Sequence, residues 1–155
     1  MSKSVARVRR ALSAAGLDIA PVETGNATTA QMAADLVGCD VAQIAKSIMF
    51  RDEAGGAAIL FVTSGVMQVD PAAASAVAGV PLGRADAALI RAQTGFAIGG
   101  VSPVGHLTPP RAFFDPHLLT FEQVWAAAGT PRHLFAIAPR KLLEISGAQA
   151  ADFTA

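Results

Sequence analysis

The sequence predicts that residues 1–155 form a single α+β domain built around a mixed β-sheet. This length falls within the usual size of one domain, and neither an internal repeat nor a linker divides the chain. Hydrophobic residues make up 52% of the chain and charged residues 15%, which excludes intrinsic disorder. Helical and strand patterns follow one another in mixed order, neither as regular strand–helix units nor as strands alone. This order favours the α+β class.

Apolar spacing and capping residues predict the elements of the first half of the chain. We expect helices at 2–16, from a Thr28 or Thr29 cap to Gly38, and at 41–45 after an Asp40 cap. We expect strands at 19–22, 46–51 and 57–63, the last two joined by a turn at 52–56. Pro21 confines the first strand to a sheet edge, since it cannot donate to a ladder.

The second half alternates short helices with short strands. We expect helices from Asp70-Pro71 to Gly79, at 87–93, at 121–128 and at 139–145. We expect extended segments or strands at 80–83, 96–98, 111–114 and 133–138. Phe153 is the one apolar anchor of the tail at 148–155.

The charge balance argues against one class of partner. Twelve basic and twelve acidic residues cancel, so bulk electrostatics do not favour binding to duplex DNA. A basic cluster near the N-terminus is more often a solvated helix face than a nucleic-acid site; it comprises Lys3, Arg7, Arg9 and Arg10. A nucleic-acid partner would therefore be held locally, by its end or by a few phosphates.

The same sequence predicts a soluble, cytoplasmic protein without a membrane partner. No apolar run approaches the ~18 residues of a membrane span, and the charged N-terminus leads into an amphipathic segment rather than a signal-peptide core. The single cysteine, Cys39, cannot form an internal disulfide. A small buried hydrophobic side chain is a better interpretation of Cys39 than a nucleophile.

The glycine-rich stretch from Thr94 to His106 is the strongest candidate for a functional loop. Its four glycines permit positive φ and close approach to the backbone, and Pro103 stiffens the turn. Such a loop can present backbone N–H groups to an anion or to a developing oxyanion. An ordinary tight connection between two strands explains the same spacing, and on spacing alone it is the commoner case.

Lys46 and His106 are the side chains best suited to chemistry. Lys46 stands in an apolar segment at a helix–strand junction, where it could donate to a carbonyl or anchor a phosphate. A lysine that extends to solvent from a strand end is the alternative. His106 is a candidate acid, base or ligand without a placed partner.

The sequence contains none of the common metal-binding, phosphate-binding or nucleophile motifs. No His, Cys, Asp and Glu cluster has metal-ligand spacing, and neither a phosphate-binding Walker loop nor a nucleophile elbow occurs. We therefore expect no metal site. An enzyme with these residues has to take its reactive group from the substrate or from water.

Three segments together resemble the YbaK-like editing domains associated with prolyl-tRNA synthetase, over about residues 20–153. The first is the helix Thr29–Gly38 followed by Gln43–Phe50, in which a lysine opens a strand. The second is a Gly-x-x-x-Pro loop at Gly99–Pro103. The third is Phe121–Gly129 followed by Leu142–Gly147. Each motif is weak alone, and their order and spacing make the resemblance specific.

The resemblance implies a sheet that closes into a barrel-like core wrapped by helices, and hydrolysis in trans of the ester bond of mischarged aminoacyl-tRNA. In such domains the lysine, here Lys46, contacts the tRNA end near the scissile ester. The loop amides hold the aminoacyl carbonyl; the loop here is Gly99, Gly100, Val101, Ser102 and Pro103. The residues expected to line the pocket for a cysteine, alanine, serine or threonine are Ser47, Ile48, Met49, Ile98 and His106. The implied partners are the single-stranded acceptor end of a tRNA and a synthetase, and no cofactor is implied.

One segment departs from the pattern of these domains. Many relatives carry basic residues after the second strand of the sheet, whereas this chain has Gln68 and the alanines 72–74 in the segment Ser64–Ala74. This segment therefore lacks positive charge that could contact phosphates. Two other functional classes stay open. One is a non-catalytic module that binds tRNA ends or a synthetase, and the other is an esterase for small molecules.

Overall fold

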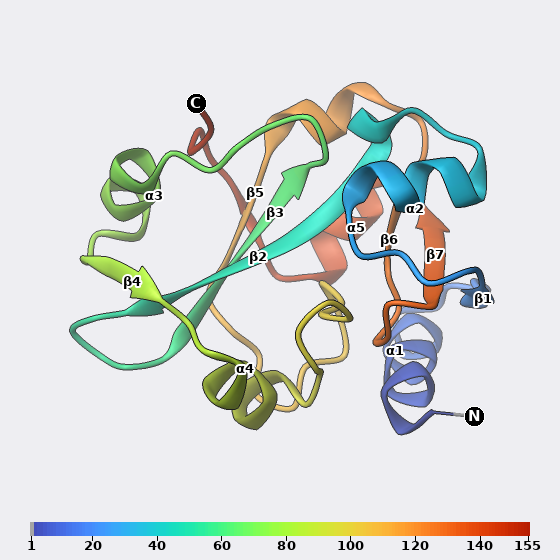
Figure 1. Cartoon of the computed structure of the whole chain (residues 1–155), viewed down its shortest axis with the longest axis horizontal. Coiled ribbons are helices and arrows are strands. Elements are labelled where there is room, and N and C mark those ends of the chain that lie inside the picture. The colour runs from blue at the N-terminus through green and yellow to red at the C-terminus, as the bar shows by residue number, and fades with distance from the viewer. Residues whose placement is uncertain (1) are drawn as a thin grey trace.

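The computed structural model describes residues 2–155, which form an eight-stranded mixed sheet with helices packed around it (Figure 1). The α-helices are α1 (Lys3–Ala14), α2 (Ala30–Val37), α3 (Pro71–Ala78), α4 (Ala87–Thr94) and α5 (Pro139–Ile145). The strands are β1 (Val22–Glu23), β2 (Ile44–Asp52), β3 (Ala58–Ser64), β4 (Leu82–Arg84), β5 (Ala112–Phe114), β6 (Val124–Ala127), β7 (His133–Ile137) and β8 (Gln149–Ala150). Two 3-10 helices, Val41–Gln43 and Pro116–Thr120, precede β2 and β6. The predicted α+β class is confirmed.

Polar side chains begin the helices close to where the sequence predicts. Thr29 accepts from the Met32 N–H at 3.1 Å, and Asp86 accepts from the Leu89 N–H at 2.8 Å. Gly38 ends α2 with φ of 74°, a left-handed conformation that glycine adopts without strain. None of the helices within residues 2–155 combines the length and apolarity that crossing a membrane requires.

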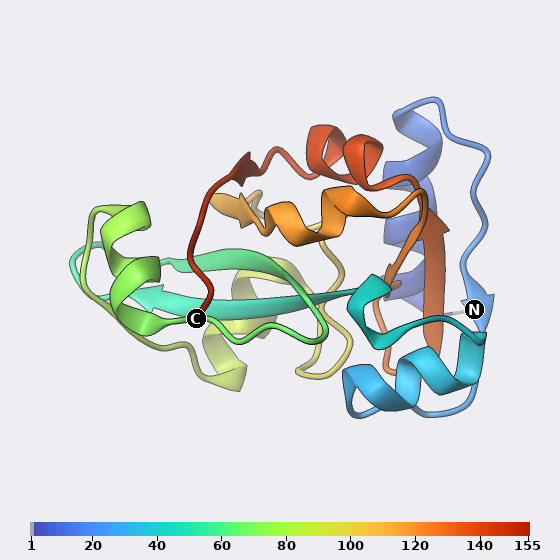
Figure 2. The same ribbon diagram turned by 90° about the horizontal axis from the view of Figure 1, so that it is seen from above.

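The hairpin of β2 and β3 is the centre of the sheet, whose strand order is β1-β7-β6-β2-β3-β5-β8 with β4 paired to the end of β2. Every residue of β3 is buried, since apolar clusters cover both of its faces. Leu60 and Val62 belong to one cluster, and the alternate residues Ile59 and Phe61 belong to the other. Helices α5 and α2 lie on opposite sides of the sheet (Figure 2). The expected barrel-like closure stays a prediction.

The helix predicted at 121–128 is wrong, because residues 124–127 form β6. This strand pairs parallel with β2 and antiparallel with β7. Its burial alternates, with Val124 and Ala126 fully buried and Trp125 and Ala127 partly exposed. The apolar residues of so short a segment fit both the helical and the strand period, and sheet pairing decides between them.

Two shorter predictions also need correction. Residues 96–98 are not a strand; Phe96 is buried, but the chain turns there and Ile98 is 57% exposed. The helix expected at 41–45 is a 3-10 turn that stops at Gln43, because Ile44 and Ala45 pair with β6. Cys39 is only partly buried, since it lies at the surface end of α2, where its thiol donates to the Asp40 carbonyl at 3.3 Å.

Candidate active site

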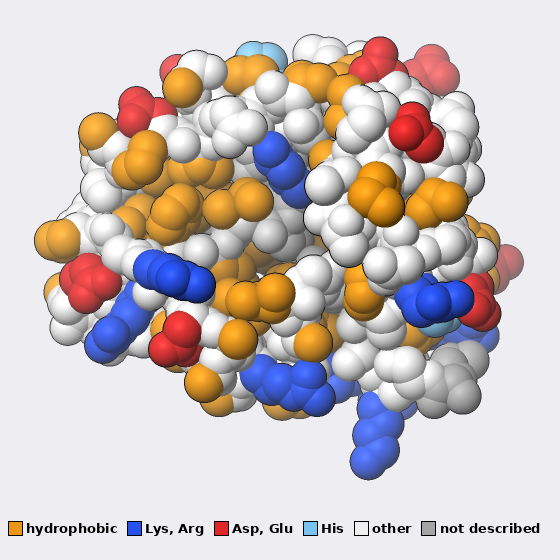
Figure 3. All heavy atoms as spheres, viewed as in Figure 1, with side chains coloured by type: hydrophobic (Ala, Val, Ile, Leu, Met, Phe, Trp, Pro, Cys, Tyr) orange, Lys and Arg blue, Asp and Glu red, His pale blue; other side chains and the backbone are white. Residues whose placement is uncertain are grey.

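A cavity of about 350 Å³ opens between α2, β2, α4 and the β6–β7 turn. Figure 3 shows this face of the molecule, with a hollow near its centre and a basic side chain at the edge of the hollow. The lining is mainly apolar, and its polar members are hydroxyls and one lysine. It comprises Ala27, Thr28, Thr29, Ala30, Ala33, Ile44, Ala45, Lys46, Ser47, Ile48, Met49, Ile90, Ile98, Gly99, Val101, Ala127, Thr130, Pro131 and Leu134.

The cavity lies where one edge of β2 has no neighbouring strand. On the side away from β3, β6 pairs with Ile44 and Ala45, and β4 pairs only with residues 50–52. Among the described strands none covers residues 46–49 on that edge. The Ile44 carbonyl accepts from the Gly65 N–H, and the Asp52 N–H donates to the Ala57 carbonyl. The backbone groups of these two even-numbered residues of β2 therefore point toward β3. Because backbone groups alternate along an antiparallel pair, those of Ser47 and Met49 point to the uncovered edge.

Lys46 lies at the start of this uncovered segment. It is half-buried and opposite Thr63 of β3. Burial lowers the pKa of its ammonium group, and the negative charge of Asp115 opposes that shift. A cation in an apolar cavity is well placed to attract an anionic or strongly dipolar ligand. The hydroxyl of the next residue, Ser47, is buried and has no hydrogen-bond partner within residues 2–155.

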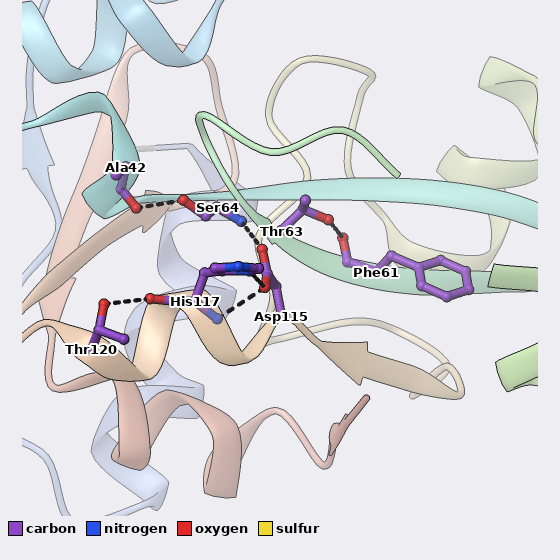
Figure 4. Close-up of polar contacts among 7 residues, drawn as sticks. All are labelled: Ala42, Phe61, Thr63, Ser64, Asp115, His117 and Thr120. Atoms are coloured by element: carbon purple, nitrogen blue, oxygen red, sulfur yellow. Dashed lines mark hydrogen bonds and ion pairs between the residues drawn. The ribbon is translucent and has the colours of Figure 1, made fainter. Parts of the chain in front are cut away.

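Asp115 is a fully buried carboxylate that lies behind the site and that sequence reasoning missed. It accepts from the Ser64 N–H at 3.0 Å, and from the N–H and Nδ1 of His117 at 2.9 and 2.6 Å (Figure 4). These bonds tie the end of β3 to the turn that follows β5. An Asp-Pro pair directly after a predicted strand was the available signal, since it marks a helix cap.

The predicted glycine loop forms another wall of the cavity, following α4. Gly99 has φ of 90°, which only glycine adopts readily, and the Gly100 N–H donates to the Ala97 carbonyl at 3.1 Å. A Cβ on Gly100 would lie 2.6 Å from Thr130 Cα, so the loop packs backbone to backbone against the β6–β7 turn. Within residues 2–155 the N–H groups of Gly99, Val101 and Ser102 meet no acceptor. Two of these residues, Gly99 and Val101, line the cavity.

The remaining predicted loop residues lie behind this wall. Ser102 and Pro103 are buried, and the Ser102 hydroxyl accepts from the Val104 N–H at 3.3 Å. His106 does not line the cavity; its Nε2 donates to the Ser102 carbonyl at 2.5 Å, and its ring meets Phe96 edge-on. Burial lowers the pKa of His106, the bond to Ser102 opposes this, and the charge of Arg7 adds to it.

The structure therefore brings together part of the predicted set. Lys46, Ser47, Ile48, Met49, Ile98, Gly99 and Val101 share the cavity, whereas Gly100, Ser102, Pro103 and His106 support it from behind. No carboxylate, imidazole or thiol is among the described lining residues, and residues 2–155 contain no group of three such side chains able to hold a metal. Such a cavity can polarise a carbonyl and bind an anion.

Comparison with known proteins gives a consistent picture. The model of the aminoacyl-tRNA editing domain matches residues 24–145. The uncharacterized protein YwhH of Bacillus subtilis (strain 168) is 33% identical over 129 residues, which cover 83% of this chain and 81% of that protein.

Solved structures agree over nearly the whole chain. A crystal structure described as a candidate trans-editing enzyme for prolyl-tRNA synthetase is 45% identical, with a TM-score of 0.93 over 100% of this chain and 99% of that one. The hypothetical protein APE2540 is 28% identical, with a TM-score of 0.87 over 96% of this chain and 99% of that one.

Proposed function

Because the chain belongs to the aminoacyl-tRNA editing domain family, we propose that it is a hydrolase that deacylates mischarged tRNA in trans. In this proposal all of residues 1–155 act as one editing domain in the cytoplasm, without a cofactor. The substrate is a tRNA that carries cysteine, alanine, serine or threonine, and the link to prolyl-tRNA synthetase rests on the structural relative. One observation carries the proposal: Lys46, Gly99 and Val101 line the same cavity, and within residues 2–155 the N–H groups of Gly99 and Val101 meet no acceptor.

The loop amides are the proposed oxyanion site. The ester carbonyl oxygen would lie against the N–H groups of Gly99 and Val101, the two loop residues that line the cavity, since the Gly100 N–H already donates to Ala97 and Pro103 has no N–H. Negative charge develops on this oxygen when a nucleophile adds to the carbonyl carbon. Donors that are already oriented stabilise that charge, and one such donor contributes about 10²–10³-fold in rate.

Lys46 is proposed to hold the end of the tRNA. Its ammonium group would contact the terminal phosphate or ribose, which places the ester beside the loop. Water forms the new bond to the carbonyl carbon, and the bond to the ribose oxygen breaks. The proton released by water would reach the ribose oxygen through a second water or the ribose hydroxyl, since the described lining residues include no carboxylate or imidazole.

The walls of the cavity suit a small side chain. Ala27, Ala30, Ala33, Ile44 and Leu134 form much of its apolar part. The uncovered carbonyls of Ser47 and Met49 are available to a substrate ammonium group. Only the single-stranded acceptor end needs to enter, which agrees with the neutral net charge of the chain.

A panel of purified tRNAs charged with cysteine, alanine, serine or threonine tests the proposal. We expect release of at least one amino acid well above the spontaneous rate. Binding of charged tRNA without turnover of any amino acid would contradict the proposal and favour a non-catalytic module, which the absence of basic residues between Ser64 and Asp70 makes worth testing. Equal hydrolysis of amino acid esters that lack tRNA would favour an esterase for small molecules.

A further inference from the structure

Helix α1 is packed directly against the loop of residues 94–106, which we call the glycine loop. A Cβ on Gly105 would lie 3.2 Å from the Arg7 carbonyl oxygen and 3.3 Å from Val8 Cα. A Cβ on Gly129 would lie 2.8 Å from the Ser4 carbonyl carbon. The helix thus touches both the far end of the glycine loop and the turn on which Gly100 rests. It precedes residues 24–145, the segment matched by the family model.

The Arg7 side chain joins the two ends of the glycine loop. Its Nε donates to the Gly105 carbonyl at 3.1 Å, and its Nη2 donates to the Thr94 carbonyl at 3.4 Å. The guanidinium carbon lies 4.7 Å from the centre of the Phe96 ring. Within residues 2–155 Arg7 has no acidic partner, so these loop groups are its polar contacts.

A short series of contacts leads from Arg7 to the loop amides. Phe96 is fully buried, and its ring meets the ring of His106 edge-on at 5.4 Å. His106 in turn bonds the Ser102 carbonyl, so Nε2 must carry the proton. Its Nδ1 is buried and has no hydrogen-bond partner among residues 2–155, which agrees with a neutral ring next to the charge of Arg7. The peptide groups around Ser102 are thereby fixed from behind.

We infer that Arg7 is a positioning residue, which holds the glycine loop so that the amides of Gly99 and Val101 stay at the cavity wall where the substrate would bind. The catalytic part of this inference rests on the proposed deacylase function. A fork of two N–H donors that bridges both ends of a loop restricts it more than a single contact can. Loss of the fork should therefore affect turnover more than tRNA binding, because Lys46 is unchanged.

The experiment compares Arg7→Met and Arg7→Lys with Arg9→Met. Arg7→Met keeps the apolar stem and removes the donors, whereas Arg7→Lys keeps the charge without the fork. Arg9 is exposed on the same helix and makes none of these contacts, so its variant is the matched control. Hydrogen exchange is followed at the amides of Gly100 and Leu107, which bond the carbonyls of Ala97 and Thr94.

We expect Arg7→Met to speed exchange at both amides by about tenfold or more, and to lower kcat by a similar factor with KM changed less than about threefold. The exchange rates and the kcat of Arg7→Lys should lie between those of Arg7→Met and those of the parent. Exchange in β3 should stay at the parent rate in every variant, because the core is intact.

Parent exchange rates in Arg7→Met would overturn the inference, and so would faster exchange with an unchanged kcat. Equal effects from Arg9→Met would show a general effect of helix charge and would also overturn it. If the parent protein hydrolyses no charged tRNA, the proposed function fails, and the exchange rates alone then decide whether Arg7 orders the loop.

Discussion

Replacing Gly100 by alanine tests whether the position of the glycine loop governs the chemistry. The new methyl group would lie 2.6 Å from Thr130 Cα and 2.9 Å from both the Gly129 oxygen and the Thr130 nitrogen. All three are backbone atoms, so no side chain can rotate away. The loop has to retreat from the β6–β7 turn by a substantial part of an ångström.

This displacement allows two magnitudes to be estimated. Overpacking of a well-packed site costs about 1–3 kcal/mol of unfolding free energy. A shift of ~1 Å in a positioning group can lower a rate by about 10²-fold. We therefore expect Gly100→Ala to fold, to lose stability in urea unfolding, and to lose about 10²-fold in kcat for a tRNA that the parent deacylates.

A variant with a similar loss of stability elsewhere provides the control. Phe153 is fully buried in the apolar cluster that contains Ile59 and Phe61 of β3. The centres of the Phe153 and Phe61 rings are 5.0 Å apart. Phe153→Leu should be destabilised to a comparable degree and keep the parent kcat. A Gly100→Ala protein that is destabilised yet turns over at the parent rate would refute the reasoning.

Three further predictions concern Lys46 and two groups that lie behind the cavity. Asp115→Ala should lower the unfolding free energy by about 3 kcal/mol or more in urea titrations, because it leaves the Ser64 and His117 N–H groups without their acceptor; an unchanged midpoint would contradict this. Because the pKa of His106 is lowered in the folded protein, the unfolded chain takes up a proton on this residue at a higher pH than the folded chain does. The stability of the parent should therefore fall as the pH drops below about 6.5, more steeply than in His106→Gln, and parallel pH curves would contradict it. The lowered pKa of Lys46 predicts that kcat/KM declines at alkaline pH before an exposed lysine would titrate, and that Lys46→Arg shifts this decline upward or removes it.

Much of the fold follows from local signals in the sequence. The caps at Thr29, Asp70 and Asp86 and the hairpin around residues 52–56 are encoded by residues close to one another in the chain. The segment 124–127 is different, because only its pairing with β2 and β7 makes it a strand. The pairing with β2 involves residues about eighty positions upstream, which no local pattern contains, whereas β7 is the next strand along the chain.

The candidate site likewise contains residues that local sequence identifies and residues that only distant contacts bring into place. Lys46 and the Gly-x-x-x-Pro loop stand out by their residue types, and the structure places Lys46, Gly99 and Val101 in one cavity. The support behind them was not predictable, because Asp115 and Arg7 act through contacts between distant segments. The sequence favours a solvated basic face for Arg7, whereas in the structure its guanidinium group lies over the Phe96 ring.

The most direct test of the account is single-turnover deacylation of a mischarged tRNA by the parent and by Lys46→Ala. Lys46 is half-buried at the uncovered edge of β2, so the variant should keep the parent unfolding midpoint. We expect its deacylation rate to fall by at least about 10²-fold, close to the spontaneous rate of ester hydrolysis. A folded Lys46→Ala protein that deacylates the same tRNA as fast as the parent would contradict the assignment of Lys46 and of this cavity as the active site.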